Sequence, residues 1–116
     1  MRTETLRAIA AAVAPPMEGA YRAFFSKAAN AWSNITGTAG GFFDHDADAH
    51  VSRTDTGLFH HGLGSHIHLK VDGAAFGGFD HGSQRYFKGS VRDGQIVVHD
   101  LVSGRDHLYA FKAEEG

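Results

Sequence analysis

The chain contains no cysteine, only two prolines, and no apolar run near the roughly 20 residues that a membrane-spanning helix requires. Without cysteine it has no disulfide, no thiolate metal ligand and no thiol nucleophile, and its redox compartment stays open. A formal charge of −2 gives no bulk attraction to nucleic acid or to anionic membranes. We therefore expect no membrane span, and nucleic acid is not a favoured partner.

The composition is otherwise that of an ordinary globular protein, with 42% apolar and 21% charged residues in a chain of 116. This length predicts a single domain over residues 1–116. Nine histidines make the charge depend on pH, because their protonation near pH 6 would make the chain cationic. We expect association or stability to change between pH 5 and 7.

The most informative pattern is a degenerate repeat in the C-terminal two-thirds of the chain. Each copy begins with an apolar residue and a polar pair, and ends with a ring and an apolar residue; the fourth copy is aligned with two extra residues. Such a unit predicts a strand, a short polar turn and a second strand. The copies are Phe43-Asp44-His45 with His50-Val51, Phe59-His60-His61 with His66-Ile67, Phe79-Asp80-His81 with Tyr86-Phe87, and Val98-His99-Asp100 with His107-Leu108.

The N-terminal segment, residues 1–33, reads as helical. Residues 3–14 favour a helix that Pro15 and Pro16 end. Residues 17–33 place apolar side chains at helical spacing, which predicts a second helix packed on a sheet. A glycine-rich linker over residues 34–41 then leads into a β-hairpin region over residues 42–112. The apolar stripe of the second helix contains Met17, Tyr21, Phe24, Phe25, Ala28 and Trp32.

Two dipeptides, Asp72-Gly73 and Asp93-Gly94, predict two-residue hairpin turns and so set the strand register. Val71 then faces Ala74, Leu69 faces Phe76, Val91 faces Ile96, and Gly89 faces Val98. Four-residue loops in the repeats would make His61 face His66 and His81 face Tyr86. The resulting apolar face comprises Leu58, Ile67, Leu69, Val71, Phe76, Phe87, Val91, Ile96, Val98, Tyr109 and Phe111.

These patterns together predict an α+β fold: an antiparallel meander of about eight short strands, with an N-terminal helix packed on its apolar face. The N-terminal helix from Arg2 to Ala14 is left uncovered in this arrangement and is a second candidate contact, by swapping or docking into a neighbouring molecule. Closure into a barrel is left open, because it depends on the shear between strands.

Histidines on the opposite face suggest a metal site. His66 and His68 lie on one side of a strand about 7 Å apart, and the predicted register adds His61. Three imidazoles with an open position suit zinc or another imidazole-favouring transition metal, and His81 is a further candidate ligand. The alternative is that repetition of one hairpin produces a ladder of rings that stabilises the sheet without any metal. Under this alternative the chain has no cofactor.

His66-x-His68 followed by Asp72 is similar to the first half of the cupin metal motif. The pattern departs from that family at Asp72, where the motif has glutamate, and at His60, where it has glycine. No second cupin motif follows, so we assign no family. No nucleophile elbow, phosphate-binding loop or dinucleotide fingerprint is present, and we name no catalytic residue.

The same face carries aromatic and basic residues that suit binding. We expect a small non-catalytic binding or assembly module that presents this face to another copy of itself or to a protein partner. A metal-binding protein with a three-histidine site, or a metal-dependent enzyme built on it, is the alternative, and a nucleic-acid or glycan module is the third reading. The residues of this predicted binding face are Phe59, Lys70, Phe79, Tyr86, Lys88 and His99.

The N-terminus is weighed as an export signal. Arg2 and Arg7 and the alanine-rich stretch after them resemble one, but Glu4 lies in the basic region and the apolar stretch is short. We expect a cytoplasmic protein, with export left open.

Overall fold

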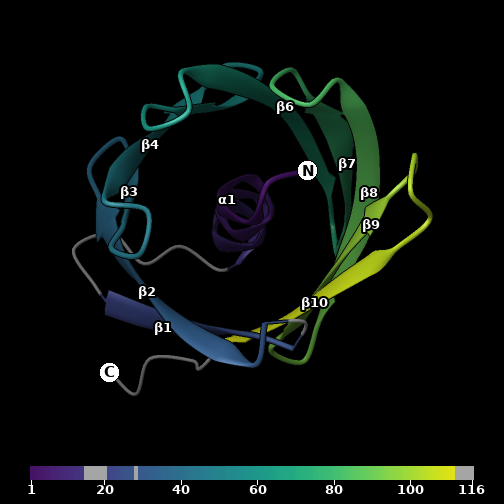
Figure 1. Ribbon diagram of the computed structural model, residues 1–116, viewed down its shortest axis with the longest axis horizontal. Coiled ribbons are helices and arrows are strands. Elements are labelled where there is room, and N and C mark those ends of the chain that lie inside the picture. The colour runs from purple at the N-terminus through teal and green to yellow at the C-terminus, as the bar shows by residue number, and fades with distance from the viewer. Residues whose placement is uncertain (15–20, 28, 112–116) are drawn as a thin grey trace.

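The structure is a computed structural model, and it describes residues 1–14, 21–27 and 29–111. One helix precedes ten strands that form a closed antiparallel barrel (Figure 1). Each strand pairs with its neighbours in the sequence, and β1 pairs with β10 to close the ring. The elements are α1 (Thr3–Val13), β1 (Tyr21–Ser26), β2 (Ala31–Thr38), β3 (Gly41–Asp44), β4 (Ala49–Thr54), β5 (Gly57–His60), β6 (Ser65–Asp72), β7 (Ala75–Asp80), β8 (Arg85–Arg92), β9 (Gln95–Asp100) and β10 (Asp106–Phe111).

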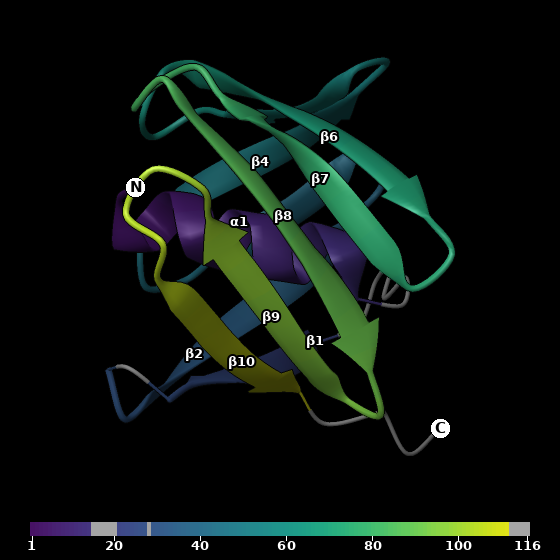
Figure 2. The ribbon, with the colours of Figure 1, turned by 90° about the vertical axis from the view of Figure 1, so that its right-hand side faces the viewer.

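Helix α1 lies inside the barrel, surrounded by the strands (Figures 1 and 2). Every residue from Thr5 to Ala12 is buried. The predicted α+β meander of eight strands with a helix on one face is therefore wrong. The sheet closes on itself, and its apolar face becomes the lining of a lumen that the helix fills. The helix is accordingly not free to contact a neighbouring molecule, as the sequence had suggested.

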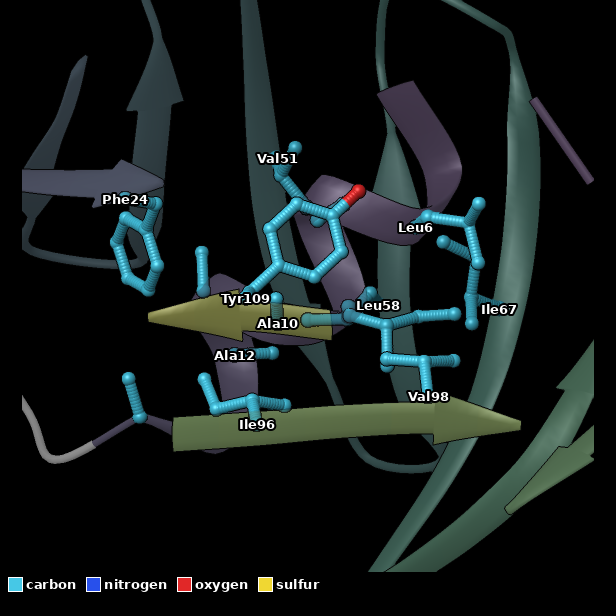
Figure 3. Close-up of a cluster of buried hydrophobic side chains, with 14 of the residues drawn as sticks. Leu6, Ala10, Ala12, Phe24, Val51, Leu58, Ile67, Ile96, Val98 and Tyr109 are labelled. Carbon is cyan, nitrogen blue, oxygen red and sulfur yellow. The ribbon is translucent and has the colours of Figure 1, made fainter. Parts of the chain in front are cut away.

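The helix fits this narrow space because its side chains are small. Four of its buried residues are alanines, and the strands supply the large side chains that pack around them. A helix that is apolar on all sides must be buried, and here the strands surround it completely. Figure 3 shows this core, in which Leu6, Ala10 and Ala12 of α1 lie among Phe24, Val51, Leu58, Ile67, Ile96, Val98 and Tyr109.

One charged side chain of α1 is buried with the alanines. Arg7 is 7% exposed, and its Nε donates a hydrogen bond of 2.6 Å to Oδ2 of Asp44 at the end of β3. Asp44 is 1% exposed and also accepts the backbone N–H groups of Asp46 and Ala47. A buried charge without a partner is costly, so this ion pair fixes the helix to one strand of the wall.

The predicted second helix and the linker after it are also wrong. Residues 21–26 form β1, residues 31–38 form β2, and β3 begins at Gly41; residues 17–20 lie outside the described residues. Phe24 and Ile35 point into the core, whereas Trp32 is half exposed on the outer surface. The apolar spacing thus arose from two short strands and the turn between them, in which Asn30 has a positive φ of 51°.

The predicted register is partly confirmed. Val91 pairs with Ile96 across the Asp93-Gly94 turn, and both turn residues have positive φ. At the other turn Val71 pairs with Phe76 rather than Ala74, because only Gly73 is left-handed and the turn moves one position along the chain.

At this turn and in the four-residue turns, the observed partner differs from the predicted one by two positions. Each side chain therefore stays on the predicted face of the sheet. Most of the predicted apolar face is buried, which confirms it; Val71 is exposed. Leu69, Val91 and Phe111 are partly buried against the core.

The turns differ between the two ends of the barrel. At one end two residues connect the strands, as between Arg92 and Gln95. At the other end four residues connect the strands, except that five separate β9 from β10, where the N–H of Asp100 bonds the carbonyl oxygen of Arg105. The fourth residue of each connection is left-handed. The repeat therefore has five copies. When Asp100 is aligned with Asp80, the last copy needs no extra residues, and the predicted two-residue insertion disappears. The left-handed residues are Asn30, Asp48, Gly64, Gln84 and Gly104.

No helix within the described residues is both long enough and apolar enough to cross a membrane.

Candidate functional site

The residues of the predicted binding face all lie on the outer surface of the barrel, because they alternate with the buried residues of β5 to β9. Lys70, Tyr86 and Lys88 are exposed, whereas Phe59, Phe79 and His99 are partly covered. Figure 2 shows the side of the barrel on which β6, β7, β8 and β9 lie next to one another.

Ring pairs line this surface beside the four-residue turns. Phe79 faces Tyr86 with ring centroids 4.7 Å apart, and Phe59 faces His66 at the same distance. The register therefore pairs His66 with Phe59 and Tyr86 with Phe79, and the predicted pairings with His61 and His81 are wrong. The four-residue turns begin one position earlier than the sequence suggested.

The histidines of the predicted metal site contact different neighbours. The Nε2 atom of His61 lies 2.8 Å from Oγ of Ser52 on β4, on the side away from β6. The ring of His66 packs on Phe59, and the ring of His68 packs on His81 at 4.7 Å between centroids. His66, His68 and His81 line one open pocket of about 550 Å³.

Over the described ranges 1–14, 21–27 and 29–111, no three histidine, aspartate or glutamate side chains are grouped closely enough to hold a metal ion. The three-histidine site stays a prediction from the sequence, and the contacts of His61 do not support it.

A second pocket lies on the outer surface of β6, β7 and β8. Its volume is about 620 Å³, and it forms where Gly77 leaves a gap between Lys70 and Lys88, its neighbours in the register. Phe79 and Tyr86 form one side of it. The pocket therefore combines aromatic rings with an ammonium group, as ligand sites often do.

An apolar turn continues this surface beyond Tyr86. Leu101 and Val102 are 48% and 62% exposed, and Tyr86 is 62% exposed. The backbone N–H of Leu101 donates to the carbonyl oxygen of Tyr86 at 3.1 Å, so the turn lies beside Tyr86 on β8. We call Phe79, Tyr86, Leu101 and Val102 the Tyr86 patch.

The other turns at this end do not carry such a pair. The positions equivalent to Leu101 are occupied by Lys27, His45, His61 and His81. The positions equivalent to Val102 are occupied by small or acidic residues, such as Gly62 and Asp46. An exposed apolar pair at one turn out of five therefore does not follow from the repeat, and exposed apolar clusters often mark interaction sites.

The buried Asp100 holds the Leu101 turn in one conformation. Oδ1 of Asp100, which is 2% exposed, accepts the backbone N–H groups of Val102 and Ser103, and Oδ2 accepts Nη1 of Arg85 at 3.0 Å. Burial alone would raise the pKa of Asp100, but these N–H donors and Arg85 bring it down to about 2. The carboxylate is thus charged at neutral pH, and it presents the two apolar side chains in a fixed position.

The same capping position recurs around the barrel. Asp44, His60, Asp80 and Asp100 are all buried at the ends of alternate strands, and each accepts backbone N–H groups of the turn that follows. These residues hold the turns and are not exposed for chemistry. Ser26 occupies the equivalent place in the first copy, and its Oγ accepts the N–H of Ala29.

His60 is the exception in this series, because an imidazole stands where three copies have a carboxylate. Its Nδ1 accepts the N–H of Leu63 at 3.2 Å, so the neutral ring carries its proton on Nε2. Nε2 is buried and has no hydrogen-bond partner among the described residues. Burial lowers the pKa of His60; Asp44 and Glu4 oppose this change, and Arg7 and His61 add to it.

We expect stability to fall as the pH drops below about 6.5, the ordinary value from which the pKa of His60 is lowered. Below that pH the unfolded chain binds a proton at His60 that the folded chain does not, and this favours unfolding. Above that pH the stability contributed by the neutral ring is fully present. His107, whose pKa burial also lowers, acts in the same direction. Urea unfolding at pH 7, 6 and 5 measures this slope, which one such group limits to about 1.4 kcal/mol per pH unit.

The control for this prediction is His60→Asn, which keeps an oxygen to accept the Leu63 N–H and removes the titration. Its stability should depend less on pH than that of the wild type. An equal dependence in both proteins would mean that His60 does not contribute.

Sequence reasoning found the aromatic and basic residues of the outer surface but missed the apolar turn and the buried caps. The signal for the caps was available, since a polar residue precedes every four-residue turn. The signal for Leu101 and Val102 was the contrast with the equivalent polar positions, which the misaligned fourth copy concealed.

No protein-family model, no curated protein and no solved structure matches this chain. The case for a function therefore depends on the surface described above.

Proposed function

We propose that this chain is a small non-catalytic binding module that presents the outer surface of β6 to β9 to another copy of itself or to a protein partner. The Tyr86 patch carries this proposal. Its three most exposed side chains are 48–62% exposed, and they lie beside an open pocket with an aromatic wall. Aromatic anchors next to a pocket are typical of the centre of a protein interface.

The interior of the barrel supports an external binding surface. Barrels of this kind can hold a small ligand in the lumen, but here α1 occupies that space, and its residues from Thr5 to Ala12 are buried. Among the described residues, the buried side-chain polar atoms have hydrogen-bond partners, as in the turn caps and ion pairs, apart from Nε2 of His60. Binding on the outside therefore fits this fold better than binding within it.

The surface also suits a protein better than a nucleic acid. Lys70 lines the pocket and Lys88 is paired with Gly77, but Asp72 also lines the pocket and Asp106 lies exposed on β10. Mixed charge around an apolar centre is typical of protein interfaces, whereas nucleic-acid surfaces carry an excess of positive charge.

The test is photo-crosslinking in cells that produce the protein, with benzoylphenylalanine in place of Tyr86. We expect one discrete crosslinked species, because a specific interface presents the same partner atoms each time. The matched control carries the same group at Thr54, an exposed residue on the far side of β5. Equal products from both positions, or none from Tyr86, would contradict the proposal.

A further inference from the structure

The partner of the Tyr86 patch can be named from the register of the strands. An apolar projection, Leu101 with Val102, lies on one side of Tyr86, and the pocket beside Phe79 and Gly77 lies on the other. Projection and pocket are therefore neighbours on one surface. A twofold axis that runs along β8 past Tyr86 would place the projection of each copy over the pocket of the other.

The charges on this surface agree with the same axis. Five residues form one row across the outer face, each paired in register with the next. A twofold axis through the middle of the row brings its first residue opposite the last residue of the other copy. The exposed Asp106, which already contacts Nδ1 of His99 in its own chain, then faces Lys70, and the partly covered His99 faces Gly77. Lys88, the middle residue, faces Lys88 of the other copy, so one like-charge contact on the axis accompanies two Asp106–Lys70 pairs. The row, in order, is Asp106, His99, Lys88, Gly77 and Lys70.

We infer that the Tyr86 patch binds a second copy of this chain, in a twofold dimer in which each Leu101 turn covers the pocket of the other copy. The inference rests on the proposed function and selects self-association from it. The complementary charges at the ends of the row and the adjacent projection and pocket are both accommodated by the same axis. An isologous contact of this kind closes after two copies, so it forms a dimer and not a filament.

Sedimentation velocity over a range of concentrations tests the inference. We expect the sedimentation coefficient of the wild type to rise with concentration towards that of a dimer. Val102→Asp should weaken association about tenfold or more, because it places a carboxylate against the apolar pocket of the other copy. Ala39→Asp adds the same charge at an exposed turn elsewhere on the barrel and should leave association unchanged.

A charge exchange tests the axis itself. Lys70→Glu and Asp106→Lys should each weaken the dimer, and the double variant should regain part of the lost affinity, because the opposite charges face one another again. A double variant no better than either single variant would contradict the twofold arrangement. Circular dichroism of each variant shows whether its barrel is folded, and all of these positions are exposed.

A wild type that stays monomeric at every concentration, or a dimer that Val102→Asp leaves intact, would overturn the inference. The crosslinking experiment separates this failure from failure of the proposed function. A crosslink from Tyr86 to a different protein would retain the binding module and exclude the dimer. A crosslink between two copies that Val102→Asp abolishes would support both.

Discussion

Gly78→Ala is expected to destabilise the barrel by about 3 kcal/mol or more, a large part of the stability of a domain of this size. Gly78 lies on β7, and its missing side chain would point into the barrel. A methyl carbon there would overlap the carbonyl oxygen of His68 and lie 2.9 Å from Cζ of Phe87. The backbone of β6 cannot move without disturbing its pairing, so the strain has no inexpensive relief. Thermal and urea unfolding measure the loss.

The neighbouring glycine is the matched control. A methyl group at Gly77 points outward, and its nearest atom outside the adjacent residues is the carbonyl oxygen of Phe87, at 3.4 Å. Gly77→Ala should be neutral or should stabilise the strand by up to about 1 kcal/mol, because alanine loses less backbone entropy on folding. Similar losses for both variants would show that β7 does not have the inward and outward sides assigned here.

Arg7→Leu should cost about 3–5 kcal/mol, because it leaves the Asp44 carboxylate buried without its cation. The two groups are 7% and 1% exposed, so water does not replace the lost partner. The variant should unfold at a lower urea concentration than the wild type.

The double variant Arg7→Leu with Asp44→Asn provides the control. Asparagine keeps an oxygen for the N–H groups of Asp46 and Ala47 and removes the unpaired charge. Much of the lost stability should return. A loss below about 1 kcal/mol for Arg7→Leu alone would mean that the ion pair does not hold the helix in place.

The first helix and the inner side of most strands could be predicted from the sequence because each depends on local signals. Alanine propensity and Pro15 determine the extent of α1, and alternation determines which side of β8 or β9 faces inward. The Asp93-Gly94 turn was placed correctly for the same reason, since its two residues favour positive φ. These signals require no knowledge of distant parts of the chain.

Closure of the barrel could not be predicted in this way. It depends on the pairing of β1 with β10, and nothing local indicates that Phe24 will face Phe111. The strands β1 and β2 were mistaken for a helix because Phe24, Phe25 and Trp32 occur at a spacing compatible with both structures. Once β1 is a strand, the apolar face has no open edge, and the only remaining place for α1 is inside.

In the candidate site, too, local signals were read correctly and contacts between strands were not. Tyr86, Phe79 and Lys88 were identified because they alternate with buried residues. Their partners across the strands were misassigned, because a four-residue turn can begin at either of two neighbouring positions. The buried position of Asp100 under the Leu101 turn depends on the three-dimensional path of that turn.

The enclosure of α1 has a consequence for the order in which the molecule folds. The seam between β1 and β10 joins the two strands furthest apart in the sequence, and such non-local contacts form slowly. A helix held within the ring cannot enter after the seam has closed without reopening it. We therefore expect the hairpins to assemble around the helix before the ring closes, with the slow β1–β10 pairing late in the process.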